Sequence, residues 1–573
     1  MKRIATMALA TLFTLNSMSQ QETITLHLVE TSDVHGNFFP VNMLSGHQTR
    51  GSMARVASYV GNLRQKYGDD VILLDNGDIL QGQPLNYYYN FVDTLSANIA
   101  AQVVNYLGYD AQTIGNHDVE TGPRVYDKWI SETRCPLLGA NVVDVQTGKP
   151  RLHPYTIIER RGLRVAIIGL LTPAIPNWLE PELWPGLCFE NMVESARKWV
   201  KVVREQEKAD LVVGLFHSGW DGGIVTPDYR EDDTKRVAEL VDGFDVIFFG
   251  HDHTPHCSRA GNNVLCLDPA NNAMQVAEAT VEVVRNNGVI VGKNVSGTIT
   301  DISAMPVDSA FMSHFASHLS AVKEWASQPI GYFANDIYVR DAFFGPSPFI
   351  DFIHNIQLKL TGADVSFNAP LSFNGAIKAG KVTVADMFSL YKYENKLYVM
   401  RLKGSEIRKH LEMSYDLWVQ TMTSPDDHLL RLNNLSANDS QRMGFSNLLF
   451  NFDSAAGIDY EVDVTQPDGH KVRILRMSNG KTFSEDAWYN VAVNSYRGNG
   501  GGELLTKGAG IERDSLRSRV VWQSERDQRY YLTEEIRKLG NVAPTANSNW
   551  RFVPEEWTNP AAQRDRELLF GSH

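Results

Sequence analysis

DAQTIGNHDVETG, at residues 110–122, places Asn116 and His117 side by side in a tight turn after a short apolar run. Four other short polar blocks share this character and occur on both sides of it along the chain. They are Asp33-Val34-His35-Gly36, Gly77-Asp78, His217-Ser218-Gly219 and Gly250-His251-Asp252-His253.

Each of these five blocks ends a short apolar run of strand type, and helical segments such as 52–67 and 191–207 separate the runs. Alternating strands and helices predict an α/β layered sheet. In such sheets, ligands bind at the carboxyl ends of the strands. We therefore expect the five blocks to lie together.

The length of 573 residues predicts more than one domain, because single cores stop growing near ~250–300 residues. Helix signals over 308–325, followed by Pro329-Ile330-Gly331, mark a boundary. Helices at 349–360, 403–413 and 513–539 then mix with alternating strands. We expect a first domain over 21–305, a linker helix over 306–331, an α+β domain over 332–553 and a loosely held polar tail over 554–573.

The N-terminus has the order of a secretory signal. Lys2 and Arg3 precede an apolar run at 4–15 and a small polar stretch at 16–20. We expect a signal peptide over 1–20 and a secreted or periplasmic protein. No later stretch reaches ~20 apolar residues, so no membrane span is expected, and the net charge of −13 argues against binding of a nucleic-acid polymer.

The four cysteines suit an exported protein. Cys257 and Cys266 flank a turn-rich insert and could close a hairpin disulfide, whereas Cys135 and Cys188 fit unpaired buried thiols equally well. No Cys-x-x-Cys spacing occurs, so a thiolate metal site is not expected.

The polar blocks together supply seven side chains of metal-ligand type. They are Asp33, His35, Asp78, Asn116, His217, His251 and His253. Seven ligands are too many for one tetrahedral ion and suit two adjacent ions. The mixture of Asp, Asn and His donors is compatible with Zn, Mn, Fe or Co. The simplest division gives Asp33, His35, Asp78 and His253 to one ion, and Asp78, Asn116, His217 and His251 to the other, with Asp78 bridging. Such a pair activates water and clamps a phosphoryl group. Separate loop caps and satisfied core histidines are the alternative, but so many buried polar groups are costly without metal.

The blocks DVHG, NGD, GNHD, HSG and GHDH resemble the calcineurin-like dinuclear metallophosphoesterase pattern. The whole chain resembles the secreted two-domain 5′-nucleotidase/2′,3′-cyclic-nucleotide phosphodiesterase family, through VTVADMFSLYKYENKLYVMRLKGSEIRKHLE, NFDSAAGIDYEVD and YNVAVNSYRGNGGGE in the second half. The resemblance implies an N-terminal four-layer metallophosphoesterase sandwich, a C-terminal α+β nucleotide-binding domain and a small nucleotide substrate.

The resemblance also implies a separate role for His117, at the leaving-group side of the phosphate. Family members usually carry GNHEFD or GNHEFN, in which the polar residue three places after His forms a dyad with it. Here the order is GNHDVE. Glu120 keeps the spacing, and Asp118 is the alternative partner for His117.

In the second domain, the resemblance places the nucleobase between two aromatic rings. Tyr496 matches one ring position, and Phe450 or Phe452 the other, although either Phe could instead be a core aromatic. Arg497, which follows Tyr496 in the same motif, and Asn395 are also expected to contact the substrate.

Two departures favour the cyclic-phosphodiesterase/3′-nucleotidase branch. FNGAIKAG has Lys378 near the place where the 5′-nucleotidase branch carries Arg, and GNGGGE has Gly502 where that branch has Asp, with Glu503 one place later. We expect an exported hydrolase of 2′,3′-cyclic nucleotides and 3′-nucleotides, acting by attack of a metal-bridging hydroxide. A 5′-nucleotidase or UDP-sugar hydrolase, a sulfur-ester hydrolase on the same fold, and a non-catalytic nucleotide-binding protein are the alternatives.

Overall fold

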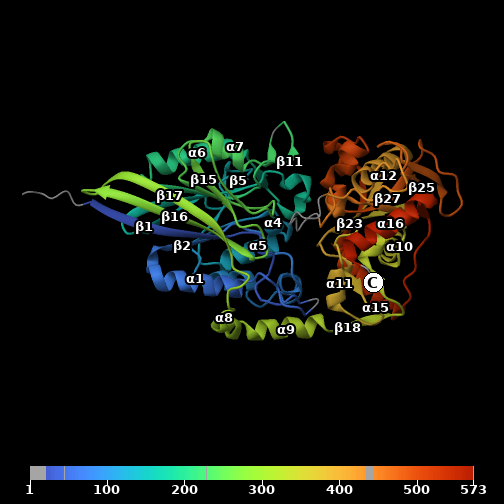
Figure 1. The fold of residues 1–573 in the computed structure, drawn as a ribbon, viewed down its shortest axis with the longest axis horizontal. Coiled ribbons are helices and arrows are strands. Elements are labelled where there is room, and N and C mark those ends of the chain that lie inside the picture. Colours follow the sequence, from blue (N-terminus) through green and yellow to red (C-terminus); the bar gives the residue numbers. More distant parts are fainter. Residues whose placement is uncertain (1–20, 44–45, 228, 434–442, 572–573) are drawn as a thin grey trace, which may run out of the picture.

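The computed structural model describes residues 21–43, 46–227, 229–433 and 443–571. The predicted signal peptide over 1–20 lies outside the described residues. Two lobes lie side by side, and α8 (Ser309–His314) and α9 (Ala316–Ala326) run beneath the first lobe toward the second (Figure 1).

Two six-stranded sheets build the first lobe. The first has the order β17 (Val289–Asp301), β16 (Gln275–Asn286), β1 (Gln21–Thr31), β2 (Val71–Asp75), β3 (Ala111–Thr113) and β4 (Leu137–Leu138). The second has the order β14 (His256–Ala260), β15 (Val264–Asp268), β13 (Val246–Phe249), β10 (Leu211–His217), β8 (Leu163–Leu171) and β7 (Tyr155–Arg160). The central strands of both sheets are parallel, and antiparallel strands occur toward the edges.

The two sheets pack face to face and helices cover their outer sides. On β8, Val165 and Ile167 join the core between the sheets, whereas Ala166 and Ile168 pack outward, because successive side chains on a strand alternate. The outer layers are α1 (Met53–Tyr67), α3 (Ile99–Leu107) and α5 (Pro123–Glu132) on the first sheet, and α6 (Met192–Glu205) and α7 (Thr234–Leu240) on the second. The predicted four-layer α/β sandwich is confirmed.

The connection between the lobes is two helices and not one. The chain leaves the helical conformation at Phe315, between α8 and α9. Phe311, Phe315 and Val322 pack into the core of the first lobe, so both helices are anchored there. Among the described helices, none combines the length and apolarity that crossing a bilayer requires.

The second lobe is built on a five-stranded sheet of order β24 (Ser454–Ala456), β20 (Val365–Asn368), β27 (Trp488–Asn494), β23 (Lys396–Lys403) and β28 (Val520–Asp527). Its main helices are α10 (Pro348–Thr361), α11 (Val384–Leu390), α12 (Gly404–Trp418) and α15 (Gln528–Leu539). The predicted mixture of helices and strands is confirmed.

Two sequence predictions about the second half are wrong. The single helix over 513–539 is interrupted by β28, because its Val520-Val521-Trp522 run favours a strand and pairs with β23 at the sheet edge. The stretch over 554–573 is not a loose tail: α16 (Glu555–Phe570) buries Ala561, and Asp565 accepts a hydrogen bond from the Leu430 amide. The open question of a Cys257–Cys266 disulfide is answered by the strand register: Cys257 pairs with Leu267 and Cys266 with Ser258, and both thiols are free.

His354, on α10, gives the second lobe a pH-dependent stability. It is fully buried, with Nδ1 2.9 Å from Ser366 Oγ and Nε2 3.1 Å from Ser454 Oγ. Burial lowers the pKa of His354 from 6.5 to about 3. Below pH 6.5 the unfolded chain therefore binds a proton that the folded chain excludes, and the free energy of unfolding falls by about 1.4 kcal/mol per pH unit.

We expect this dependence in denaturant unfolding of the second lobe, followed by tryptophan fluorescence. Between pH 6.5 and pH 5, wild type should lose about 2 kcal/mol more than His354→Gln, whose amide does not titrate. Equal pH slopes for the two proteins would contradict the assignment.

Candidate metal centre

The predicted ligands lie at or just after the carboxyl ends of β1, β2, β3, β10 and β13. Five of the seven have a positive φ: Asp33 (50°), His35 (47°), Asp78 (54°), His251 (85°) and His253 (58°). Non-glycine residues rarely adopt this conformation, which costs of order 1–3 kcal/mol and concentrates at functional sites. Backbone hydrogen bonds hold the loops together, with His35 N donating to Asp78 O at 2.9 Å.

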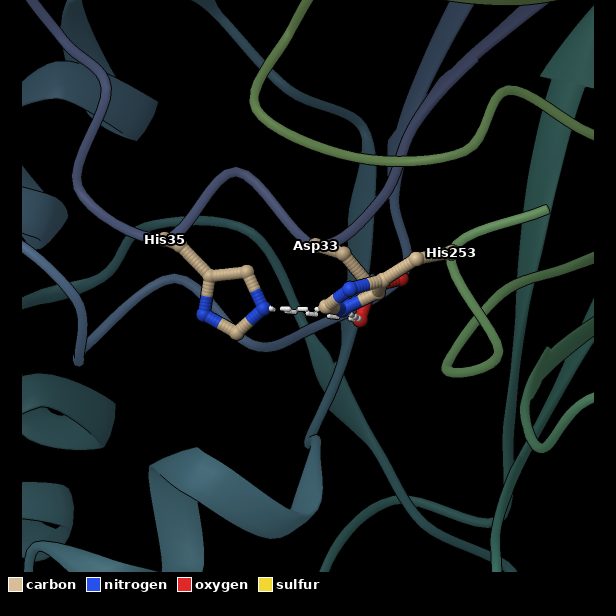
Figure 2. A group of neighbouring side chains, drawn as sticks. All are labelled: Asp33, His35 and His253. Carbon is tan, nitrogen blue, oxygen red and sulfur yellow. Dashed lines mark hydrogen bonds and ion pairs between the residues drawn. The ribbon is translucent and has the colours of Figure 1, made fainter. Parts of the chain in front are cut away.

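Asp33, His35 and His253 form one cluster (Figure 2). The two imidazoles point toward each other, with 3.0 Å between their Nε2 atoms, and His253 Nε2 is 3.3 Å from Asp33 Oδ1. Burial and the charge of His253 lower the pKa of His35 to about 3, so its ring is neutral. Asp33 Oδ1 is buried and has no hydrogen-bond donor. Converging lone pairs and an undonated carboxylate oxygen fit a divalent cation.

Asp78, Asn116 and His217 form a second cluster beside the first. His217 Nε2 lies 3.0 Å from Asn116 Oδ1 and 3.4 Å from Asp78 Oδ2. Asp78 Oδ2 is also 4.0 Å from His35 Nε2, so this carboxylate stands between the two clusters. Burial opposes a charged imidazole, but the Asp78 and Asp33 carboxylates raise the pKa of His217 to about 9. Without a cation, protons therefore balance part of the negative charge here.

The Nδ1 atoms of His217 and His253, which face away from the clusters, also have polar partners. His217 Nδ1 is 2.7 Å from the Asn76 carbonyl oxygen. His253 Nδ1 is 3.0 Å from the Asn271 side-chain nitrogen, while the buried Asn271 Oδ1 lacks a donor. Turning that amide over lets its oxygen accept the Nδ1–H of His253. Both rings then present Nε2 to the cluster, the arrangement typical of metal-bound histidine.

His251 and His253 lie in different parts of the site. Both follow the end of β13 and lie in a loop with left-handed backbone. His253 joins Asp33 and His35, whereas the His251 ring lies 5.3 Å from that of His217, centroid to centroid. His251 Nε2 contacts Glu231 Oε1 at 3.1 Å. Glu231 is absent from the predicted site residues, because no pattern in the sequence links it to the polar blocks.

His117 contacts Glu120 and not Asp118. His117 Nδ1 is 2.5 Å from Glu120 Oε2, and its backbone N donates to Asp78 Oδ1 at 2.8 Å. Burial alone would lower the pKa of His117. The Asp78 and Glu120 carboxylates outweigh burial and raise this pKa to about 10, so the ring is a cation at neutral pH. Asp118 instead accepts four backbone N–H groups, from Asp78, Ile79, Leu80 and Gly115. The alternative prediction for Asp118 is therefore wrong, because its carboxylate is committed to the loop backbone.

The second lobe brings Tyr496 and Phe450 together. Their ring centroids are 6.0 Å apart and their planes are nearly perpendicular. Phe452 is fully buried and stacks on Trp418, so the prediction that it contacts substrate is wrong. Arg497 is also buried, and a direct substrate contact is wrong for it too. Its guanidinium binds Asp453 and Asn451 side chains and the Phe450 and Gly501 carbonyls.

Contacts on two sides fix the second lobe against the loops of the first. Gln81 donates to Glu394 at 3.0 Å, next to Asn395, which is 8% exposed. On the other side, Tyr398 donates to the buried Glu180 at 2.7 Å. The Trp178 ring packs 5.6 Å from that of His251, and Asn499 donates to the Trp178 carbonyl at 3.1 Å.

Comparison with known proteins agrees with this arrangement. Residues 26–255 match the calcineurin-like phosphoesterase family, and residues 327–507 match the family described as 5′-nucleotidase, C-terminal domain. The 2′,3′-cyclic-nucleotide 2′-phosphodiesterase/3′-nucleotidase of Yersinia enterocolitica is 27% identical over 611 residues, covering 94% of this chain and 89% of the relative. A 5′-nucleotidase of Vibrio cholerae is 30% identical over 251 residues, covering 42% of this chain and 43% of the relative.

A solved structure shows the same fold. The crystal structure of a 5′-nucleotidase precursor from Thermus thermophilus has a TM-score of 0.62 at 22% identity, covering 93% of this chain and 100% of the other. The clustered carboxylates and imidazoles, with the match to residues 26–255, define a divalent-metal-dependent phosphoester hydrolase of the calcineurin-like class. The chain belongs to the family in which this domain is followed by a 5′-nucleotidase C-terminal domain.

Proposed function

We propose that this enzyme hydrolyses 2′,3′-cyclic nucleotides and 3′-nucleotides with two divalent metal ions. The observation that carries the proposal is the convergence of the His35 and His253 Nε2 atoms on the undonated oxygen of Asp33, with Asp78 between this cluster and Asn116–His217. Asp33, His35, Asp78 and His253 would hold one ion, and Asp78, Asn116, His217 and His251 the other. Bound ions would supply activation of water and neutralisation of phosphoryl charge.

The residues of the chain supply the remaining steps. His117, held by Glu120, carries a proton at neutral pH beside Asp78. It would donate that proton to the leaving oxygen of the ester, with Glu120 keeping its ring oriented. The product oxygen thus leaves as a hydroxyl group.

Tyr496 and Phe450 would receive the nucleobase, with Asn395 as a polar contact. The second-lobe loops also support the cyclic and 3′-nucleotide branch. A Cβ at Gly502 would come 2.0 Å from Asn451 Oδ1 and 2.3 Å from Arg497 Nη1, so the ribose-binding Asp of the 5′-nucleotidase branch does not fit. Lys378, near the place where the 5′-nucleotidase branch carries Arg, is exposed, and its Nζ forms an ion pair with Asp336 at 3.0 Å. The full-length similarity to the Yersinia phosphodiesterase, against a match over 42% of the chain to the Vibrio 5′-nucleotidase, points the same way.

A substrate panel tests the proposal directly. Initial rates with 2′,3′-cyclic AMP, 3′-AMP, 5′-AMP and UDP-glucose should rank the first two well above the others. A wide preference for 5′-AMP or UDP-glucose would overturn the assignment to 2′,3′-cyclic nucleotides and 3′-nucleotides. If the protein binds metals but turns over none of the four substrates, the non-catalytic nucleotide-binding alternative would be favoured. The segment over 1–20 supports export, which fractionation of cells producing the full chain would test.

The clamp formed by Tyr496 and Phe450 makes a separate prediction. Tyr496→Ala should raise KM for 2′,3′-cyclic AMP about 10- to 100-fold, because loss of base stacking costs ~1–3 kcal/mol, with a smaller change in kcat. Steady-state kinetics measure both constants. Tyr332→Ala is the matched control, since Tyr332 is half exposed on β18 (Pro329–Phe333). An unchanged KM in Tyr496→Ala would contradict the clamp.

A further inference from the structure

We propose that Glu231 is a positioning residue for His251: its carboxylate accepts the Nε2–H of the imidazole and so turns the Nδ1 lone pair toward the metal centre. The inference rests on the proposed function, in which His251 is a ligand. It adds a carboxylate that is absent from the seven predicted ligands and from the His117–Glu120 pair.

The contact itself is short and largely shielded from water. Glu231 Oε1 lies 3.1 Å from His251 Nε2, with the side chains 17% and 12% exposed. Glu231 Oε2 accepts the Ile224 backbone N–H at 2.7 Å, so both carboxylate oxygens are committed. Asp232 Oδ1 is 4.0 Å from the same nitrogen and accepts the Gly219 N–H instead. Glu231 is therefore the acceptor for His251.

The backbone of Glu231 is fixed to the strand end that carries His217. Its carbonyl oxygen accepts hydrogen bonds from Thr172 Oγ1 and Ser218 Oγ, both at 2.8 Å. Ser218 follows His217 directly, so one segment sets the place of both histidines. Opposite it, Gly223 has a φ of +58°, and a Cβ there would lie 2.6 Å from Glu231 Oε2. The hairpin of β11 (Gly222–Val225) and β12 (Arg230–Asp232) thus closes over the carboxylate only with glycine at this position.

The two neighbouring histidines present opposite nitrogens. His217 has Nδ1 against the Asn76 carbonyl and Nε2 toward Asp78. For His251 the Nε2 is occupied by Glu231, which leaves Nδ1 as the atom able to bind metal. A carboxylate is a stronger acceptor than a carbonyl, so it fixes the tautomer and raises the basicity of the ligand nitrogen.

Metal binding to the full-length protein tests the role without relying on turnover. Metal-free wild type, Glu231→Ala, His251→Ala and Asp221→Asn would be titrated with Co²⁺, following the visible absorption and the bound stoichiometry. Glu231→Ala should weaken one of two sites about 10- to 100-fold, the usual effect of losing such a partner, and keep the stoichiometry at high Co²⁺. Asp221→Asn should bind like wild type, since the Asp221 carboxylate is on the same hairpin and forms ion pairs with Arg230 and Lys235.

The outcomes separate this inference from the proposed function. If His251→Ala loses one ion and Glu231→Ala binds like wild type, the positioning role is wrong and the ligand assignment stands. If Glu231→Ala loses the ion as completely as His251→Ala, Glu231 is itself a ligand. If His251→Ala retains both ions, the ligand assignment fails.

A spectroscopic readout reports the tautomer. In Zn²⁺-loaded protein with ¹⁵N-labelled histidine, the His251 signal, identified by its loss in His251→Gln, should show the proton on Nε2. A proton on Nδ1 would overturn the inference. Should Glu231→Ala fail to fold by circular dichroism, Glu231→Gln replaces it, because the amide keeps the volume and is a weaker acceptor; its Co²⁺ affinity should fall between those of wild type and His251→Ala.

Discussion

Asp78→Ala is expected to lose both metal ions and almost all turnover. The Asp78 carboxylate lies 3.4 Å from His217 Nε2 and 4.0 Å from His35 Nε2, so it stands between the two clusters. Its second oxygen accepts the backbone N–H of His117 and so fixes the segment that carries His117. Loss of several kcal/mol of transition-state stabilisation corresponds to a fall of about a thousandfold or more in kcat/KM.

Metal content after dialysis, measured by mass spectrometry beside the rate with 2′,3′-cyclic AMP, checks this prediction. Asp69→Ala, at an exposed acid just before β2, should retain wild-type metal content and rate. Retention of two ions by Asp78→Ala would contradict the bridging position. Chelation of wild type should reproduce the loss of rate, and added Zn²⁺, Mn²⁺ or Co²⁺ should restore it.

His117→Ala should lower kcat by about 10²- to 10⁴-fold while leaving metal content unchanged, because in the proposed mechanism the ring would donate a proton and would not bind metal. Glu120→Gln should fall between this variant and wild type, since the amide still contacts Nδ1 but no longer stabilises the imidazolium. His153→Ala, at an exposed histidine, is the matched control.

The leaving group provides a sharper test of the same residue. The loss in His117→Ala should shrink for an ester with an acidic leaving group, such as a nitrophenyl phosphate, because such a leaving oxygen needs no proton. A loss of equal size for both kinds of ester would assign His117 to binding and not to proton donation.

Much of the first lobe could be predicted because its signals are local. The strand runs, the helices between them and the polar residues at the strand ends each occupy a few consecutive positions, and parallel sheets bring such ends together. The contact between Glu231 and His251 could not be found in this way. It joins a hairpin to a loop 20 positions away, and one glutamate carries no periodicity.

The second lobe shows where local signals mislead. Phe450 and Phe452 are two positions apart with equal hydrophobicity, yet only the path of the chain after the 3₁₀ turn at Leu449–Asn451 decides which is buried. The Arg513–Leu539 segment contains good helix formers on both sides of β28, and pairing with β23 overrides them. In α16, Asp565 accepts a hydrogen bond from Leu430, far away in the sequence, and helps to hold this polar segment in place.

The buried guanidinium of Arg497 bears on the distance between the Tyr496 and Phe450 rings and the metal centre. It ties the segment that carries Phe450 to the segment that carries Tyr496, so the two rings form one rigid unit. The span from the rings to Asp78 then depends on how the two lobes dock, through Glu180 and Glu394. In the proposed function, such a span would select for the length of the ribose–phosphate connection and tolerate any base that can stack.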